Sequence, residues 1–239
     1  MNKIIENFLN IHKAEYSIEH LNAETAFEHF TNRCIVNKYS NERFDPSDIM
    51  TDPGEKGLDG VAICVNGRVI TSIDELESIL SEAKSLDVRF VFIQAKTSEH
   101  FDGDEIGTFI YGVKAFFAPE DLRPKTNEKM DNLINLKDEI YKHSIDMTSA
   151  PVLDLYYVCC GKWDRGNGLQ ARVNLDIQPL NNTQDFSSVT FFPYDSEKII
   201  TTYKELKKKV SRSFAMEKRV TFPPIDGVKQ AFLGLVKCK

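Results

Sequence analysis

Hydrophobic positions recur at helical spacing near the start of the chain. The predicted helical region 1–39 contains one apolar stripe, formed by Ala23, Phe27, Phe30 and Cys34. Asn22, directly before this stripe, is a typical helix N-cap. The following segment, 40–60, combines prolines and glycines with Asp and Ser residues, so we expect a loop that leads to Asp59.

The next apolar runs have the pattern of β structure and then of helix. Residues 61–71 form two short apolar runs joined by Asn66-Gly67, the dipeptide that a type I′ hairpin turn prefers. A Ser72-x-x-Glu75 capping box then begins a predicted helix. The run DVRFVFIQAK that follows predicts a strand buried on both faces, and EIGTFIYGVKAFFA predicts an amphipathic helix packed back onto the sheet.

The second half of the chain adds further elements to this pattern. We expect a helix over about 128–145, strands at 151–160, 170–180 and 187–194, and a helix from about 196. The predicted fold class is α/β, with a mixed central β-sheet flanked by helices. One domain is expected over 1–239, with its core at about 20–120 and an extension at about 121–239, and the abrupt apolar end favours the amino-terminal part of a longer protein.

Composition and cysteine spacing indicate the size of the core and the cellular compartment. The chain has 239 residues, of which 41% are hydrophobic, which is enough for a sizeable core. No apolar run is long enough to cross a membrane, and the odd number of scattered cysteines lacks zinc-ligand spacing, so we expect a cytoplasmic protein with reduced thiols. These cysteines are Cys34, Cys64, Cys159, Cys160 and Cys238.

The charge distribution is uneven. A net charge of −6 argues against nonspecific coating of nucleic acid, although a local basic groove remains compatible with it. Residues 203–220 are basic and could line such a groove or form a solvated helix face. The acidic stretch 99–105 could bind a metal, but acidic residues at a helix start are favoured by the helix dipole, which is the interpretation we prefer.

Three polar residues close to the predicted sheet carry the candidate chemistry. Gln94 and Lys96 share one face of their strand by the two-residue period, and Asp59 stands at the entrance of the hairpin. Asp59, the Gln94 side-chain oxygen and the Ala95 backbone carbonyl could bind Mg²⁺ or Mn²⁺, which prefer oxygen ligands. Lys96 could position a water or stabilise charge on a phosphate. Taken singly, a strand ending in Q-x-K is usually solvated, and an Asp between glycines usually forms a turn.

These residues also carry a resemblance to a known family. FEHF in the leading helix, then GLDG, then FIQAK followed by TSEHFDGDEIGTF, resembles the amino-terminal region of the abortive-infection phage-resistance (AIPR) family. That region is similar to the PD-(D/E)XK restriction-type nucleases, especially their Mrr-like branch. The resemblance is concentrated in residues 57–110 and implies a restriction-endonuclease-like core that hydrolyses DNA in a bacterial antiphage system.

The resemblance also assigns roles to individual positions. The motif aspartate falls on Asp59, the Q-x-K on Gln94 and Lys96, and the helix glutamate on Glu28, with Glu24 one turn earlier as the alternative. DNA and a divalent cation are the implied partners, with activity gated by a further part of the protein or by homo-oligomerisation. The neutral Gln94 and the missing proline before Asp59 depart from the strict pattern, so a catalytically weak or inactive module that recognises nucleic acid or a phage protein is the alternative.

Overall fold

The computed structural model describes residues 1–52, 57–164, 168–208, 218–222 and 232–235. The chain divides into two compact units, Met1–Leu206 and Lys207–Lys239. In the second unit, β6 (Lys218–Thr221) pairs antiparallel with β7 (Phe232–Leu235). All the candidate site residues lie in the first unit.

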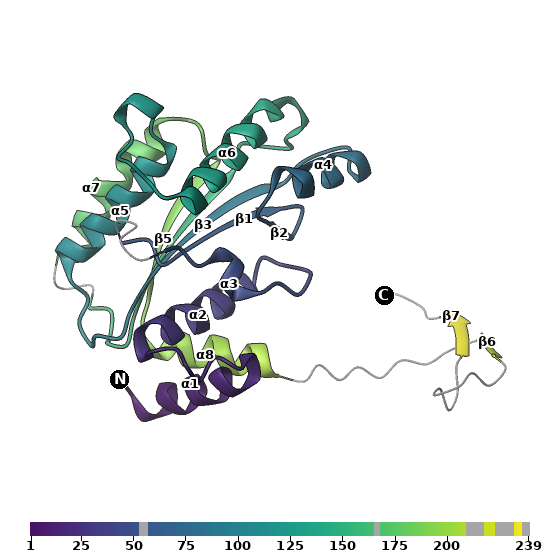
Figure 1. Cartoon of the computed structure of the whole chain (residues 1–239), viewed down its shortest axis with the longest axis horizontal. Helices are drawn as coiled ribbons and strands as arrows, with labels where there is room; N and C mark the ends of the chain where they lie inside the picture. Colours follow the sequence, from purple (N-terminus) through teal and green to yellow (C-terminus); the bar gives the residue numbers. More distant parts are fainter. Residues whose placement is uncertain (53–56, 165–167, 209–217, 223–231, 236–239) are drawn as a thin grey trace. The chain divides into compact units, whose positions relative to one another are not determined.

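A mixed five-stranded sheet forms the centre of the first unit (Figure 1). Its strand order is β2-β1-β3-β4-β5, with β1 antiparallel to both of its neighbours and β3, β4 and β5 parallel to one another. The predicted α/β class with a mixed central sheet is therefore confirmed. The strands are β1 (Gly60–Val65), β2 (Arg68–Ile70), β3 (Val88–Lys96), β4 (Val152–Cys159) and β5 (Ser188–Tyr194).

Helices cover both faces of this sheet (Figure 1). The longer helices on one face are α4 (Ile73–Glu82), α5 (Gly103–Phe117), α6 (Glu128–Lys142) and α7 (Leu169–Asn182). Those on the other face are α1 (Lys3–Tyr16), α2 (Ala23–Val36), the short α3 (Pro46–Ile49) and α8 (Ser196–Lys207). Two short 3₁₀ helices, Glu120–Leu122 and Ser144–Asp146, lie in connections.

Local sequence signals account for most of these elements. Asn66 and Gly67 have φ angles of 52° and 76°, which is the left-handed pair that the predicted type I′ turn requires. The capping box of Ser72 and Glu75 is formed at the start of α4, and Asn22 caps α2 by accepting from the Thr25 N–H at 2.9 Å. Strand β3 is buried on both faces because it lies in the middle of the sheet.

The prediction of a strand at 170–180 is wrong, because this segment lies within helix α7. The letters ARVNLDI alternate between apolar and polar, but Val173, Ile177 and Leu180 also recur at helical spacing, and these three are the buried positions. Leu175, which the alternation would bury, is 68% exposed. The loop prediction for 40–60 also missed α3, which Asp45 caps before Pro46.

The central sheet extends beyond the predicted core at 20–120. Strands β4 and β5 come from the predicted extension and pair directly alongside β3. Cys34, Cys64, Cys159 and Cys160 are buried and form no disulfide within the described part of the chain, whereas Cys238 lies outside it. Within the described part of the chain, no helix is both long and apolar enough to cross a membrane.

Candidate functional site

Asp59 lies where the pairing of β1 with β3 ends. The last paired residues are Gly60 and Ile93, and the Asp59 N–H still donates to the Ile93 carbonyl at 2.9 Å. One step further, the Asp59 carboxylate oxygen Oδ2 accepts a hydrogen bond from the Ala95 N–H at 2.7 Å. The carboxylate therefore accepts the hydrogen bond that a backbone carbonyl would accept if the pairing of β1 with β3 continued. This bond holds the carboxylate beside the end of β3.

Gln94 is buried on the α5 side of the sheet. It follows Phe90 and Phe92 on one face of β3, and only 2% of its surface is exposed. Its side-chain oxygen Oε1 is buried without a hydrogen-bond partner among the described residues. An unpaired buried acceptor is costly, which makes this atom a candidate ligand for a cation. Lys96, two residues later, shares this face but is partly exposed.

Gly57 closes the space around the Gln94 amide. Its φ of 75° is in the left-handed region. A Cβ at this position would lie 3.1 Å from Gln94 Nε2 and 3.3 Å from the backbone nitrogen of Phe109. The glycine thus permits both the turn before Asp59 and the close approach of that turn to β3 and α5.

Glu28 lies near Asp59 and Lys96, on a helix that covers the face of the sheet opposite to Gln94. Helix α2 packs on the face that carries Ile93 and Ala95, and Glu28 is half-buried on that helix. Burial raises the pKa of Glu28 to about 7; the charge of Asp59 adds to the increase, and that of Lys96 opposes it. Glu24 is exposed, so of the two glutamates Glu28 has the surroundings of a site residue.

Burial also raises the pKa of Asp59 above its usual value. The Ala95 N–H and the charge of Lys96 act in the opposite direction and favour the carboxylate. Two acids with raised pKa values and one lysine therefore interact electrostatically at the end of β3. Such a combination of burial and charge partners is typical of functional sites, although structural ion pairs also produce it.

Replacing Glu28 with glutamine is expected to remove part of the pH dependence of stability. In the unfolded chain a glutamate titrates near 4.5, whereas in the folded protein the pKa of Glu28 is about 7. The native state is therefore favoured by the protonated acid below pH 4.5 and loses that advantage as the pH rises through 7. At pH 8, Glu28→Gln should raise the free energy of unfolding by about 1–2 kcal/mol, after allowance for solvent screening of a half-buried group.

Urea denaturation between pH 5 and pH 8 measures this effect. The exposed Glu24, on the same helix, is the matched control: Glu24→Gln should leave nearly all of the wild-type slope in place. The burial of Glu28 would have no electrostatic consequence if Glu28→Gln and the wild type lost stability in parallel.

The oxygen atoms at the end of β3 suit a hard cation. The N–H and C=O of one extended residue point to the same side of a strand, so the Ala95 carbonyl faces the side on which Asp59 accepts from the Ala95 N–H. Asp59, Gln94 Oε1 and this carbonyl form a set of oxygen ligands of the kind that Mg²⁺ takes. No group of three or more His, Cys, Asp or Glu side chains that could hold a metal is found among the described residues, so a cation here would depend on the Gln94 and backbone oxygens.

Sequence reasoning missed Asn32 and Tyr157 near Asp59, and it considered Glu105 only as part of the acidic stretch 99–105. Asn32, completely buried on α2, donates from Nδ2 to the Asp59 carbonyl at 3.1 Å. Glu105 accepts from the Tyr157 hydroxyl at 2.8 Å, and its charge raises the pKa of Asp59. Asn32 stands between the polar residues Thr31 and Arg33, so the sequence pattern does not single it out. The Glu105–Tyr157 pair depends on β4 lying beside β3.

The acidic stretch after β3 begins helix α5, as the favoured interpretation predicts. Asp102 caps this helix by accepting from the N–H groups of Asp104 and Glu105, which lowers the pKa of Asp102. Asp104 pairs with Arg172 at 3.0 Å. Of the basic run, Lys207 and Lys208 are exposed, whereas Lys209 and Arg212 lie outside the described residues, so a DNA groove there stays a prediction.

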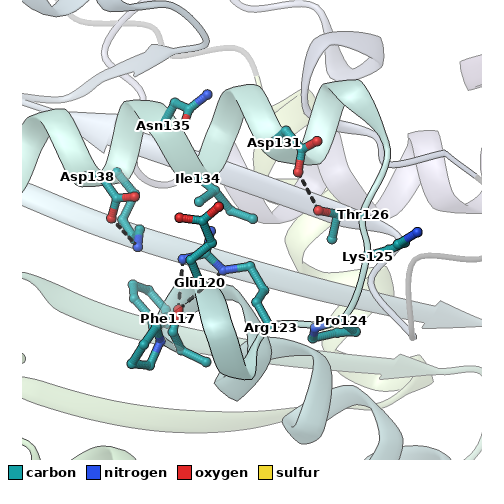
Figure 2. A pocket seen from close by; sticks show the side chains of 13 residues that line it. Phe117, Glu120, Arg123, Pro124, Lys125, Thr126, Asp131, Ile134, Asn135 and Asp138 are labelled. Atoms are coloured by element: carbon teal, nitrogen blue, oxygen red, sulfur yellow. Dashed lines mark hydrogen bonds and ion pairs between the residues drawn. The ribbon is translucent and has the colours of Figure 1, made fainter.

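A separate polar hollow of about 770 Å³ lies between α6 and the segment 117–126 (Figure 2). None of the candidate residues lines it. Several of its charged groups are already engaged, because Lys137 pairs with Asp138 and Arg123 donates to the Ala118 carbonyl. The residues to which the sequence analysis assigns chemistry therefore lie outside this hollow.

Comparisons of the chain with protein-family models, with curated proteins and with solved structures give no match. The resemblance to the AIPR family and the restriction-endonuclease-like core therefore stay predictions.

Proposed function

We propose that the chain is a metal-dependent endonuclease domain that hydrolyses DNA phosphodiester bonds. The observation that carries the proposal is the end of β3, where the Asp59 carboxylate binds the Ala95 N–H, the charge of Lys96 acts on Asp59, and the Gln94 oxygen is buried without a partner among the described residues. The resemblance of residues 57–110 to AIPR proteins supports DNA as the substrate and antiphage defence as the setting.

Asp59, Gln94 and the Ala95 carbonyl would hold Mg²⁺ or Mn²⁺, with Glu28 as a further candidate ligand. When bound, such an ion polarises a phosphoryl oxygen and makes a water more acidic. Lys96 would stabilise the negative charge that builds on the phosphate oxygens. In the reaction a water oxygen bonds to phosphorus, the bond from phosphorus to a sugar oxygen breaks, one water proton passes to a base, and the leaving sugar oxygen takes up a proton from a solvent water.

Glu28 suits the role of that base. A general base works best when its pKa lies near the working pH, and the pKa of Glu28 is about 7. Because Glu28 comes from α2, whereas Gln94 and Ala95 lie in β3 and Asp59 directly precedes β1, the base and these three cation ligands would approach the phosphate from different elements. Proton acceptance by Glu28 predicts a rate that rises with pH up to about 7.

Cleavage assays with defined metals test this proposal. The wild-type chain should cut supercoiled, linear or single-stranded DNA in Mg²⁺ or Mn²⁺ and should cut none of them in EDTA. The same ions should raise its melting temperature, since a ligand that binds only the native state stabilises it. Ca²⁺, which also takes oxygen ligands but has a different size and geometry, is an informative third ion.

The alternative is a nuclease-like module that binds without cutting. The neutral Gln94 favours it, because a site with one acidic residue fewer holds a divalent cation less tightly. A chain that binds DNA but shows neither cleavage nor a metal-induced change in melting temperature would support this alternative over the enzyme.

A further inference from the structure

The buried amide of Asn32 joins helix α2 to the strand end that carries Asp59. Asn32 is completely buried, and its Nδ2 donates to the backbone carbonyl of Asp59 at 3.1 Å. Asp59 is therefore held by three hydrogen bonds. Its N–H donates to the Ile93 carbonyl, its carboxylate accepts from the Ala95 N–H, and its carbonyl accepts from Asn32. Two of these contacts come from β3, and only the Asn32 contact comes from another element.

Gly60 lets the asparagine approach the strand closely. A Cβ at residue 60 would lie 2.3 Å from Asn32 Oδ1 and 2.7 Å from Asn32 Nδ2, so the amide group rests directly on the glycine backbone. No larger residue at position 60 could keep this contact without displacing Asn32. The first residue of β1 is thus fitted to the side chain on α2.

The contact of Asn32 with the strand end buries a polar atom that is not fully hydrogen-bonded, which is unfavourable for the packing of a helix on a sheet. Asn32 is completely buried, and its Oδ1 has no hydrogen-bond partner among the described residues. An apolar side chain would avoid that unpaired oxygen. Positions that depart from good packing in this way are expected to be functional or strained.

Asn32 also lies one helical turn after Glu28 on the same side of α2. Its bond to the Asp59 carbonyl therefore fixes the helix that carries Glu28 against the strand end that carries Asp59. We propose that Asn32 is a positioning residue, which sets the placement of Glu28 relative to Asp59 through its contacts with the Asp59 carbonyl and with Gly60. This inference rests on the proposed function, because the two acids matter to each other as parts of one site.

Asn32→Leu tests the proposal, since leucine has a similar volume and lacks the amide. We expect kcat for DNA cleavage in Mg²⁺ to fall about 10- to 100-fold with KM for DNA unchanged, as for other residues that orient a metal site. The melting temperature should stay within a few degrees of the wild type. Asn37→Leu is the matched control, because Asn37 is an exposed asparagine at the end of the same helix and should change neither value.

Gly60→Ala provides a second route to the same change. The added methyl group should push the Asn32 amide away and reproduce the loss of kcat. The double variant Gly60→Ala with Asn32→Leu should then lose little more than either single variant, because both changes remove one interaction. Additive losses would show two unrelated defects and would overturn the proposal.

Backbone hydrogen exchange separates the failure of this proposal from that of the nuclease assignment. Without the hydrogen bond from Asn32 to the Asp59 carbonyl, the Asp59 amide should exchange at least about tenfold faster in Asn32→Leu than in the wild type. Amides in the middle of β3 should remain protected. If the wild type neither cuts DNA nor responds to metal, the nuclease proposal fails, and the exchange of Asp59 alone then decides whether Asn32 holds it. Unchanged exchange, or a loss of kcat that only parallels a loss of folded protein, would overturn the positioning role.

Discussion

Asp59→Asn should abolish metal-dependent cleavage while leaving the protein at least as stable as the wild type. Asparagine keeps the shape of the side chain and an oxygen that can accept from the Ala95 N–H. It removes the negative charge that a cation would need, so we expect the rate to fall at least about 1,000-fold, equivalent to several kcal/mol of lost stabilisation. Because burial raises the pKa of Asp59, the charged form weakens folding, and the neutral amide relieves that cost.

The two effects have opposite signs and are measured on the same preparation. Cleavage rates in Mn²⁺ report activity, and melting temperatures with and without Mn²⁺ report both stability and metal binding. Asp87→Asn is the matched control, since Asp87 is an exposed aspartate just before β3. If Asp59→Asn still cut DNA at the wild-type rate, Asp59 would have no part in the chemistry.

Much of the fold follows from signals that are local in sequence. The Asn66-Gly67 turn, the capping box at Ser72 and the doubly buried run of β3 each depend on a few neighbouring residues, and all three are present in the structure. The error at 170–180 arose where local signals conflict. There Val173 and Ile177 fit either period, and only the packing of α7 against the sheet decides that Leu175 faces solvent.

The candidate site was predictable only in part. Gln94 and Lys96 lie two residues apart on one strand, and Asp59 precedes the strand that pairs with it, so strand geometry brings them together. The contact of Asn32 with Asp59 and that of Tyr157 with Glu105 join residues 27 and 52 positions apart. Such contacts depend on how α2 and β4 pack on β3, which periodicity within one segment does not specify.

The structure also gives a physical reason for a neutral residue at position 94. This side chain is 2% exposed, and burial and the charge of Glu105 already raise the pKa of the nearby Asp59. A further buried carboxylate at position 94 would add to this repulsion and raise the pKa of Asp59 more. Glutamine offers a cation its oxygen without that repulsion, at the cost of weaker attraction for the ion.

Lys96→Met should separate catalysis from metal binding. Methionine keeps an unbranched apolar side chain but lacks the ammonium that would stabilise the phosphate oxygens, so the cleavage rate should fall about 100- to 1,000-fold. Lys96 favours the charged forms of Asp59 and Glu28, and its loss should raise both pKa values. Because a neighbouring cation repels a bound metal ion, removal of Lys96 should leave the metal-induced rise in melting temperature intact or enlarge it.

Asp59→Asn and Lys96→Met therefore form a pair with one shared outcome and one opposite outcome. Both should slow cleavage at least about 100-fold, but only Asp59→Asn should abolish the rise in melting temperature with Mn²⁺. Lys84→Met, at an exposed lysine after α4, controls for the general loss of a positive charge and should cut at the wild-type rate. If Lys96→Met lost the response to Mn²⁺ together with cleavage, Lys96 would support the structure of the site and would not act on the phosphate, because a cation has no favourable interaction of its own with a bound metal ion.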